Sequence, residues 1–363
     1  MFAPPRNAFA FLTSCSVLDD MRLRAQEGIS PSADGDQRLR LWTSRAGLSS
    51  TSCILGLLVL CRLIYYCLCY KKPKGLIIMS VRTDLAVEMI DEDAKNLPKG
   101  IKRKLRKSSA CSVTEIIVTD EVAGIRIGKS RGRYITVETD RLSASPQDFD
   151  EQVENIAAEI TALKGNDRKT ALVAGLGNSD ITPDALGPLV VSRIIATRHL
   201  QDVLPDGHEL RQLNRVSAIA PGVLGQTGIE AAEIIKSICE VAKPDCVIVI
   251  DALACSDVSR LGTTIQLTDT GISPGSGVQN RRKELSEATV GVPVIAIGVP
   301  TVVDMHTIVE NITGNPPDKH LPNMMVTPRD VDQLIDRTAK LLAYSINKAV
   351  QPMLTIEDIT ALS

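Results

Sequence analysis

Short apolar runs alternate with longer segments of helical periodicity through most of the chain. Runs of four to seven apolar residues predict buried strands, and apolar residues at every third or fourth position predict amphipathic helices. Such alternation is typical of α/β proteins, so we expect a doubly wound, mostly parallel sheet with flanking helices. The strands are predicted at residues 171–174, 245–250, 263–267 and 292–298, and the helices at residues 148–164, 182–199, 227–241, 327–342 and from residue 300 onward.

The region before this alternation is richer in predicted strands. Residues 113–118, 124–128 and 134–138 alternate apolar and polar positions between turn residues, which predicts a small β-rich N-terminal part. A basic run at residues 102–107 precedes them. Such a run can bind phosphates, but it is more often a solvated face, and we adopt the second interpretation.

Residues 1–78 share none of this pattern. Residues 53–70 are almost wholly apolar, interrupted by Arg62 and followed by a lysine cluster at residues 71–74. That length just reaches a membrane span, and the lysines favour a cytoplasmic side for the rest of the chain, which would make a membrane-tethered precursor. The alternative interpretation is that residues 1–78 are not native coding sequence and that translation begins at Met79.

Composition and charge are those of an ordinary globular protein. Of the 363 residues, 44% are hydrophobic and only 3% are aromatic, so aliphatic side chains must build the core. The net charge of -2 exerts no overall attraction on nucleic acid. The nine cysteines show neither a disulfide framework nor paired metal-ligand spacing, which favours a reducing compartment and argues against a structural zinc site.

The most informative stretch joins the strand at residues 171–174 to the helix that comes after it. Gly175 and Gly177 permit a tight turn, and Thr182 followed by Pro183 is typical of a helix start with Thr182 as the N-cap. Asp184 then lies in the first helical turn. In open α/β sheets, ligands bind at the carboxyl ends of the strands, which is where this loop is expected.

A second carboxylate, Asp251, directly follows the predicted strand 245–250. If that strand neighbours 171–174, Asp184 and Asp251 converge on one edge of the sheet. Two carboxylates at short range can share a proton, because both cannot ionise cheaply; one then activates water while the other protonates the leaving group. The alternative for Asp184 is a structural role, since an acid in the first turn stabilises a helix by itself.

Other chemistries are less well supported by the sequence. Neither a dinucleotide fingerprint nor a phosphate-binding lysine motif is present, and Ser276 lies in a GSG context that is not the serine-hydrolase elbow. Cys255 has no evident histidine partner and is expected to be a core thiol. His306 is an alternative third metal ligand beside Asp184 and Asp251, although we expect a solvated or satisfied histidine.

The stretch GLGNSDITPDALGP, residues 175–188, closely resembles the spore germination proteases of endospore-forming bacteria. The resemblance extends in the same order to residues 81–88, 217–230, 250–254, 269–277 and 298–304. It implies an endopeptidase, made as a self-processing zymogen, that degrades small acid-soluble spore proteins, the DNA-coating proteins of the dormant spore. The family's two essential aspartates fall on Asp184 and Asp251, so the resemblance implies an atypical aspartic-type mechanism.

The resemblance also implies the fold of the hydrogenase maturation proteases. Those relatives bind a metal through two acids and a histidine, and since no convincing counterpart of the histidine is evident here, we expect no metal and no other cofactor. A homotetramer, no direct contact with nucleic acid, and a location in the cytoplasm of the forespore and spore core are further implications. The membrane becomes a partner only if segment 53–70 is expressed.

The same resemblance places a propeptide junction at Asp84-Leu85. The expected organisation is therefore an extension over residues 1–78, a propeptide over 79–84 and a single protease domain over 85–363. Two alternatives stay open. One is a metallopeptidase of the hydrogenase-maturation type, and the other is a non-enzymatic module whose basic run at 102–107 docks on DNA or on DNA-coating proteins.

Overall fold

The computed structural model describes residues 83–90, 97–144, 148–275, 282–315, 317–318 and 322–363. The chain divides into two compact units, Met1–Met79 and Ser80–Ser363, and every described residue belongs to the second. The apolar segment 53–70 therefore lies outside the described residues, and so does the propeptide 79–84 except for its last two residues. No helix among the described residues is both long enough and apolar enough to cross a membrane.

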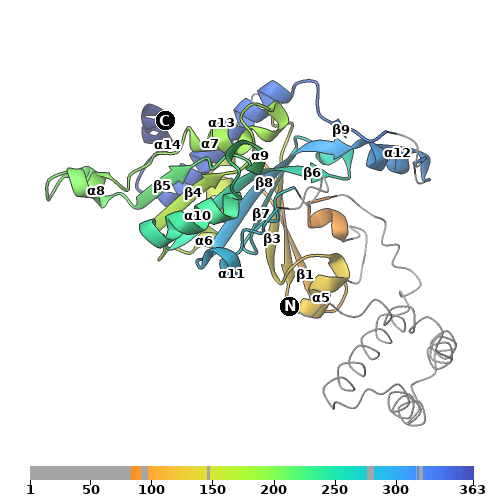
Figure 1. Cartoon of the computed structure of the whole chain (residues 1–363), viewed down its shortest axis with the longest axis horizontal. Coiled ribbons are helices and arrows are strands. Elements are labelled where there is room, and N and C mark those ends of the chain that lie inside the picture. The colour runs from red at the N-terminus through yellow and green to blue at the C-terminus, as the bar shows by residue number, and fades with distance from the viewer. Residues whose placement is uncertain (1–82, 91–96, 145–147, 276–281, 316, 319–321) are drawn as a thin grey trace, which may run out of the picture. The chain divides into compact units, whose positions relative to one another are not determined.

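The described strands form one mixed sheet in the order β1-β2-β3-β7-β8-β6-β4-β5, with β9 beside β8 (Figure 1). The pairs β4/β5, β4/β6 and β6/β8 are parallel, and the other pairs are antiparallel. The strands are β1 (Ile101–Lys107), β2 (Ser112–Val118), β3 (Gly132–Glu138), β4 (Thr170–Gly175), β5 (Arg215–Ile219), β6 (Cys246–Cys255), β7 (Thr264–Thr268), β8 (Val294–Asp304) and β9 (Met325–Val326).

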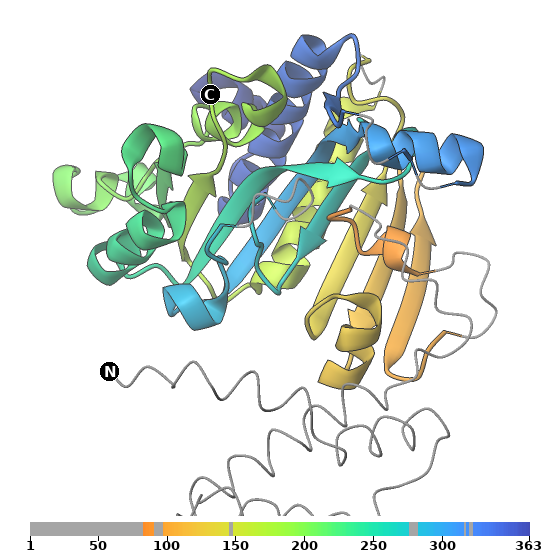
Figure 2. The ribbon, with the colours of Figure 1, turned by 45° about the vertical axis from the view of Figure 1, so that its right-hand side comes forward.

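Helices cover both faces of the parallel part of this sheet, which confirms the predicted α/β class (Figures 1 and 2). The described sheet is mixed, whereas a mostly parallel one was predicted, because the N-terminal strands β1–β3 join the parallel part through the antiparallel strand β7. One face carries α6 (Phe149–Lys164), α7 (Leu186–Val191) and α13 (Val331–Val350), and the other carries α10 (Ala231–Ala242) and α11 (Glu287–Val290). The remaining helices are short: α5 (Glu121–Ile127), α8 (Leu200–Val203), α9 (Leu224–Thr227), α12 (Met305–Thr313), α14 (Ile356–Leu362), and the 3-10 turns η1 (Val87–Met89), η2 (Thr182–Asp184), η3 (Glu209–Gln212) and η4 (Val258–Arg260).

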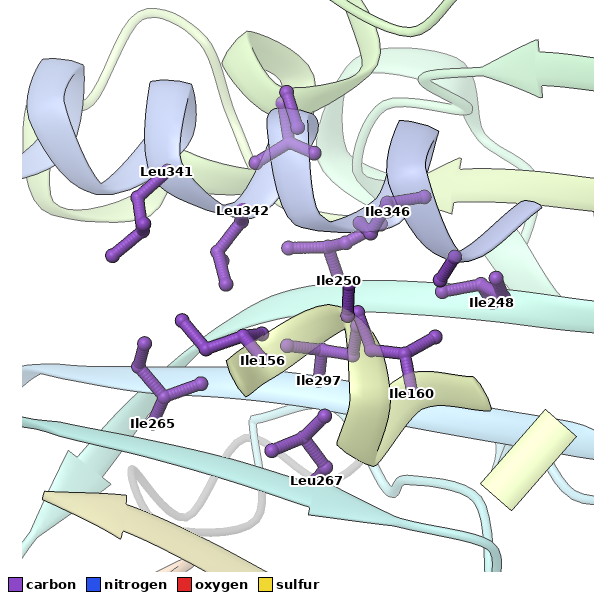
Figure 3. Packing of buried hydrophobic residues seen from close by; sticks show 14 of the residues in the cluster. Ile156, Ile160, Ile248, Ile250, Ile265, Leu267, Ile297, Leu341, Leu342 and Ile346 are labelled. Carbon is purple, nitrogen blue, oxygen red and sulfur yellow. The ribbon is translucent and has the colours of Figure 1, made fainter. Parts of the chain in front are cut away.

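Aliphatic side chains build the core, as the low aromatic content requires. Leu342 and Ile346 of α13 point toward Ile250 of β6 and Ile297 of β8 (Figure 3), and all four side chains are fully buried. Ile156 of α6 packs into the same layer (Figure 3). Burial of such a side chain contributes roughly 1.5–3 kcal/mol before the loss of conformational entropy is counted, so this layer fixes the strands that carry the site.

The antiparallel part of the sheet is covered by the N-terminal segment of the described chain. Leu85, Ala86 and Val87 are buried against Tyr134 of β3 and Leu253 of β6. Figure 2 shows this segment, coloured orange, lying against the antiparallel strands. The β-rich N-terminal part predicted from the sequence is thus an extension of the main sheet, because β3 pairs with β7.

Residues 124–127 belong to helix α5 and Gly128 follows it, so the prediction of a strand at residues 124–128 is wrong. The Asp120 carboxylate accepts the Ala123 N–H at 2.8 Å and caps the helix, and Gly128 ends it in the left-handed region with φ 65°. The alternation of isoleucine and arginine resembled a strand, but this short helix leaves Ile125 exposed and buries Ile127. The local capping signals decide the structure here.

Three predicted helix starts are also misplaced. β8 runs through Pro300 and Thr301, and the next helix begins at Met305 with the Asp304 side chain as its cap. Helix α10 begins at Ala231 because Gly228 ends the preceding turn in the left-handed region. The C-terminal helix α13 begins at Val331, past the predicted cap. The basic run 102–107 is strand β1, whose side chains are exposed as expected.

Candidate active site

The sheet reverses its winding between β4 and β6. The chain passes from β4 to β5 through α7 on one face, and from β5 to β6 through α10 on the other face. Neighbouring parallel strands whose connections leave in opposite directions open a crevice at their carboxyl ends. The loop after β4 and the distal half of β6 therefore frame the place where a ligand is expected.

Asp184 ends the 3-10 turn η2 in this crevice. Its Oδ2 accepts the backbone N–H of Asn178 at 2.8 Å, which closes the loop on itself. The turn is tied to β8 because the Thr301 hydroxyl donates to the Pro183 carbonyl at 2.8 Å. The predicted cap is wrong, since Ile181 precedes the turn and Thr182 lies within it. Asp184 is half-buried and ends this turn, whereas the first turn of a helix was predicted for it.

Three glycines let this turn pack on the end of β4. A Cβ on Gly175 would overlap the Gly187 carbonyl, and a Cβ on Gly187 would overlap the Leu176 backbone. Gly177 has φ 109°, and a Cβ there would overlap the Asp184 carbonyl oxygen. Larger residues would therefore push the Asp184 turn away from the sheet.

Asp251 lies inside β6, so the prediction that it follows the strand is wrong. β6 pairs with β8 from Val247 to Cys255, with a register shift at Leu253/Ala254, and Asp251 is paired with Gly298. Its side chain is only 5% exposed, and one carboxylate oxygen accepts the Ala252 N–H at 3.0 Å. β4 has already ended opposite Ile250, which leaves the distal part of β6 without a neighbour from β4.

Asp184 and Asp251 line the same pocket of about 440 Å³. Burial raises the pKa of Asp251 well above its usual range, and the negative charges of Asp184 and Asp84 raise it further. Burial also raises the pKa of Asp184, while the hydrogen bond from Asn178 opposes that rise. The structure thus brings together the two predicted carboxylates and makes simultaneous ionisation unfavourable, as a proton-sharing pair requires.

Asp84 lies in the same pocket and pairs with the free edge of β6. Its N–H donates to the Ala254 carbonyl at 3.0 Å, and its carboxylate accepts the Ala254 N–H at 2.9 Å. The Asp84 carbonyl oxygen accepts two further hydrogen bonds, from Lys129 Nζ at 2.7 Å and from Gln266 Nε2 at 3.1 Å. Lys129 and Gln266 were not predicted as site residues, because no local sequence pattern marks them.

The residues after Asp84 hold the Asp84-Leu85 junction in place. Leu85 is fully buried. One carboxylate oxygen of Glu88 accepts the N–H and the hydroxyl of Ser256 at 2.8 and 2.7 Å, and the other accepts the Asp257 N–H at 3.0 Å. The predicted junction is therefore fixed on its carboxyl-terminal side by the buried Leu85 and by the hydrogen-bonded carboxylate of Glu88.

The other candidate residues lie elsewhere. His306 is in the first turn of α12 and is not among the residues that line the pocket. Among the described residues, no three His, Cys, Asp or Glu side chains are grouped so as to hold a metal ion. Cys255 is fully buried, and burial raises its thiol pKa to about 12, as expected for a core thiol. Ser276 lies outside the described residues.

Known proteins are similar to this chain over most of its length. The sequence profile described as germination protease matches residues 80–314. The germination protease of Clostridium tetani (strain Massachusetts / E88) is 42% identical over 322 residues, covering 78% of this chain and 99% of that protein. The germination protease of Caldanaerobacter subterraneus subsp. tengcongensis is 40% identical over 328 residues, covering 79% and 99%.

A solved structure, the [NiFe] hydrogenase maturation protease HycI from Thermococcus kodakarensis KOD1, is 18% identical with a TM-score of 0.29. It covers 50% of this chain and 94% of its own. That similarity is too low to carry an argument about chemistry, whereas the sequence matches extend over both predicted aspartates.

Proposed function

Because the chain belongs to the germination protease family and is an endopeptidase, we propose that Asp184 and Asp251 are its catalytic pair. The single observation that carries this proposal is the position of both carboxyl groups in one pocket, with Asp251 buried inside a strand. A water molecule between two such groups can be activated by the ionised one, while the protonated one supplies a proton to the leaving amine.

We assign the proton to Asp251 and the negative charge to Asp184. Asp251 is the more deeply buried, and its pKa is raised well above the usual range by burial and by two nearby carboxylates. Asp184 is half-buried, and its carboxylate is stabilised by the Asn178 N–H at 2.8 Å. In this assignment Asp184 takes the proton from water, and Asp251 protonates the nitrogen of the scissile bond.

The first bond that this pair cuts is, in our proposal, Asp84-Leu85 of the chain itself. Asp84 enters the pocket by pairing with Ala254, in the way that an extended peptide adds to a free strand edge. Cleavage there would remove the propeptide 79–84 together with anything that precedes it. An Asp84→Lys variant should fold but fail to mature, because Lys cannot accept the Ala254 N–H; normal maturation would refute the docking role.

We further propose that the substrates are small acid-soluble spore proteins, cut during germination in the spore core. Family membership supports this choice, and an extended segment of such a protein would occupy the β6 edge that Asp84 occupies in the precursor. A homotetramer is the expected assembly, which light scattering on the purified chain would measure. The precursor would bind a membrane only if segment 53–70 is part of the expressed protein.

The test is digestion of a small acid-soluble spore protein by the purified full chain. Asp184→Asn and Asp251→Asn should each abolish cleavage, and a chelator should not affect the parent. Asp180→Asn is a matched control, because Asp180 is exposed on the same loop and should leave cleavage unchanged. Cleavage retained by both active-site variants would exclude the pair. Cleavage abolished by the chelator and restored by zinc would identify a metallopeptidase instead.

A further inference from the structure

We propose that Lys129 and Gln266 are catalytic residues that stabilise the oxyanion formed when the Asp84-Leu85 bond is cut. The inference rests on the proposed self-cleavage. It assigns a function to two side chains that no sequence pattern marked. Both donate to the same atom, the Asp84 carbonyl oxygen, at 2.7 Å from Lys129 Nζ and 3.1 Å from Gln266 Nε2. Both distances are to the carbonyl oxygen of the intact peptide, and donors that stabilise an oxyanion act over about the same range from the position that the oxyanion takes.

The Gln266 amide holds the scissile bond from both sides. Its Nε2 donates to the Asp84 carbonyl, and its Oε1 accepts the Ala86 N–H at 2.6 Å. One rigid amide thus contacts the residue before the bond and the second residue after it. Leu85, between them, is fully buried. This clamp fixes the orientation of the Asp84-Leu85 peptide group relative to the sheet.

Strand register places Gln266 on the same face as Asp251. Asp251 of β6 is paired with Gly298 of β8, and Gly298 is paired with Gln266 of β7. Paired residues of neighbouring strands project to the same face, and neighbouring strands lie about 4.8 Å apart, so the two Cα atoms are about 10 Å apart. Gly298, at the middle position, carries no side chain, and the Leu253 side chain lies over it. Asp84 links the two, because it lines the same pocket as Asp184 and its carbonyl oxygen accepts a hydrogen bond from Gln266 Nε2.

Lys129 brings a positive donor to a place where negative charge would develop. It lies just after helix α5, and its own N–H donates to the Gly124 carbonyl at 3.0 Å, so its backbone is fixed before reaction. Burial lowers its pKa, and the charges of Asp84 and Glu88 offset only part of that lowering. A prepositioned donor in a site with little water stabilises an oxyanion strongly because nothing needs to reorganise.

The reaction balances with these groups and water alone. Water oxygen attacks the Asp84 carbonyl carbon and gives a proton to the ionised Asp184. The carbonyl π electrons move to oxygen, and the resulting oxyanion is held by Lys129 and Gln266. When the C–N bond breaks, its electron pair stays on the Leu85 nitrogen, which takes a proton from Asp251. The products are a carboxyl group on Asp84 and a free amine on Leu85.

The test is the first-order rate at which the purified full chain acquires a Leu85 N-terminus, measured by mass spectrometry. Lys129→Met and Gln266→Met should each slow cleavage by about 10²–10³-fold, the typical effect of losing one such donor. Lys102→Met is the matched control, because Lys102 is exposed on β1, and it should cleave at the parent rate. Lys129→Arg, which keeps a positive donor, should recover part of the rate.

Hydrogen exchange of residues 84–88 separates chemistry from docking. We expect protected amides and slow cleavage in Lys129→Met. If both methionine variants lost amide protection as well as cleavage, Lys129 and Gln266 would only anchor the segment, and the inference would be overturned. It would also be overturned if these variants kept residues 84–88 protected and cleaved at the parent rate. Asp184→Asn and Asp251→Asn test the proposed catalytic pair separately: if they cleave normally, the pair is wrong whatever the donors do.

Discussion

Replacing Asp251 should stabilise the protein at neutral pH while it abolishes cleavage. Asp184→Asn and Asp251→Asn form a matched pair, because each removes one carboxylate and neither should process itself. In Asp184→Asn the remaining carboxylate is Asp251, which is 5% exposed and accepts the Ala252 N–H. In Asp251→Asn the remaining one is Asp184, half-buried with the Asn178 N–H as donor. Ionising Asp184 in the Asp251→Asn variant therefore costs less free energy than ionising Asp251 in the Asp184→Asn variant.

The sign of the pH dependence is set by the raised pKa of Asp251. A carboxyl group with a higher pKa in the folded state binds its proton more tightly there than in the unfolded chain. Stability is therefore full below the unfolded value of about 3.9 and is lost as the pH rises toward the folded value. Each tenfold difference in proton affinity corresponds to about 1.4 kcal/mol.

We expect Asp251→Asn to exceed Asp184→Asn in unfolding free energy by about 1–3 kcal/mol at pH 8, the usual cost of a poorly satisfied buried polar group. This difference in unfolding free energy should disappear near pH 3.5, because the remaining carboxyl group is then protonated in the folded state of both variants. At about 2–4 °C per kcal/mol for a domain of this size, scanning calorimetry of the two full-length variants would resolve it. Equal stability at every pH, or a less stable Asp251→Asn, would refute the electrostatic reasoning.

Two further substitutions and one labelling experiment test the packing of the protein around the pair. Gly187→Ala should slow self-cleavage and lower the unfolding free energy by about 1–3 kcal/mol, because its Cβ would overlap the Leu176 backbone; unchanged thermal unfolding would contradict the close packing. Glu88→Gln should lose about 1–3 kcal/mol and the amide protection of residues 84–88, since it weakens the hydrogen bonds to Ser256; full protection would argue against the anchor. The Cys255 thiol, with a pKa of about 12, should resist alkylation at pH 8 in the folded chain, and rapid labelling would show that it is accessible.

Elements with strong local patterns could be predicted from the sequence. The amphipathic helix at residues 148–164 is α6, and the apolar run 171–174 lies in β4. The convergence of Asp184 and Asp251 was also predictable, since carboxyl ends of neighbouring parallel strands meet at one edge. The prediction required only that β4 and β6 be neighbours, as they are.

The partners of the Asp84 carbonyl could not be predicted in this way. Lys129 and Gln266 meet there because β7 pairs with β8 and because the segment after Asp84 crosses the antiparallel strands. These contacts join residues 45 and 182 positions apart in the sequence, and local periodicity carries no information about such pairings. The strand predicted at residues 124–128 failed for a local reason, because the Asp120 cap and Gly128 favour a helix.

The pH dependence of kcat/KM for a small acid-soluble spore protein tests the shared proton most directly. Asp184 must be ionised and Asp251 protonated, so the rate should rise and then fall as the pH increases. The falling limb should lie above the usual range of an aspartic acid, because burial and the neighbouring Asp184 carboxylate, which stays after maturation, raise the pKa of Asp251. A rate that keeps rising into alkaline pH, or that does not change with pH, would contradict a pair of aspartates acting as base and acid.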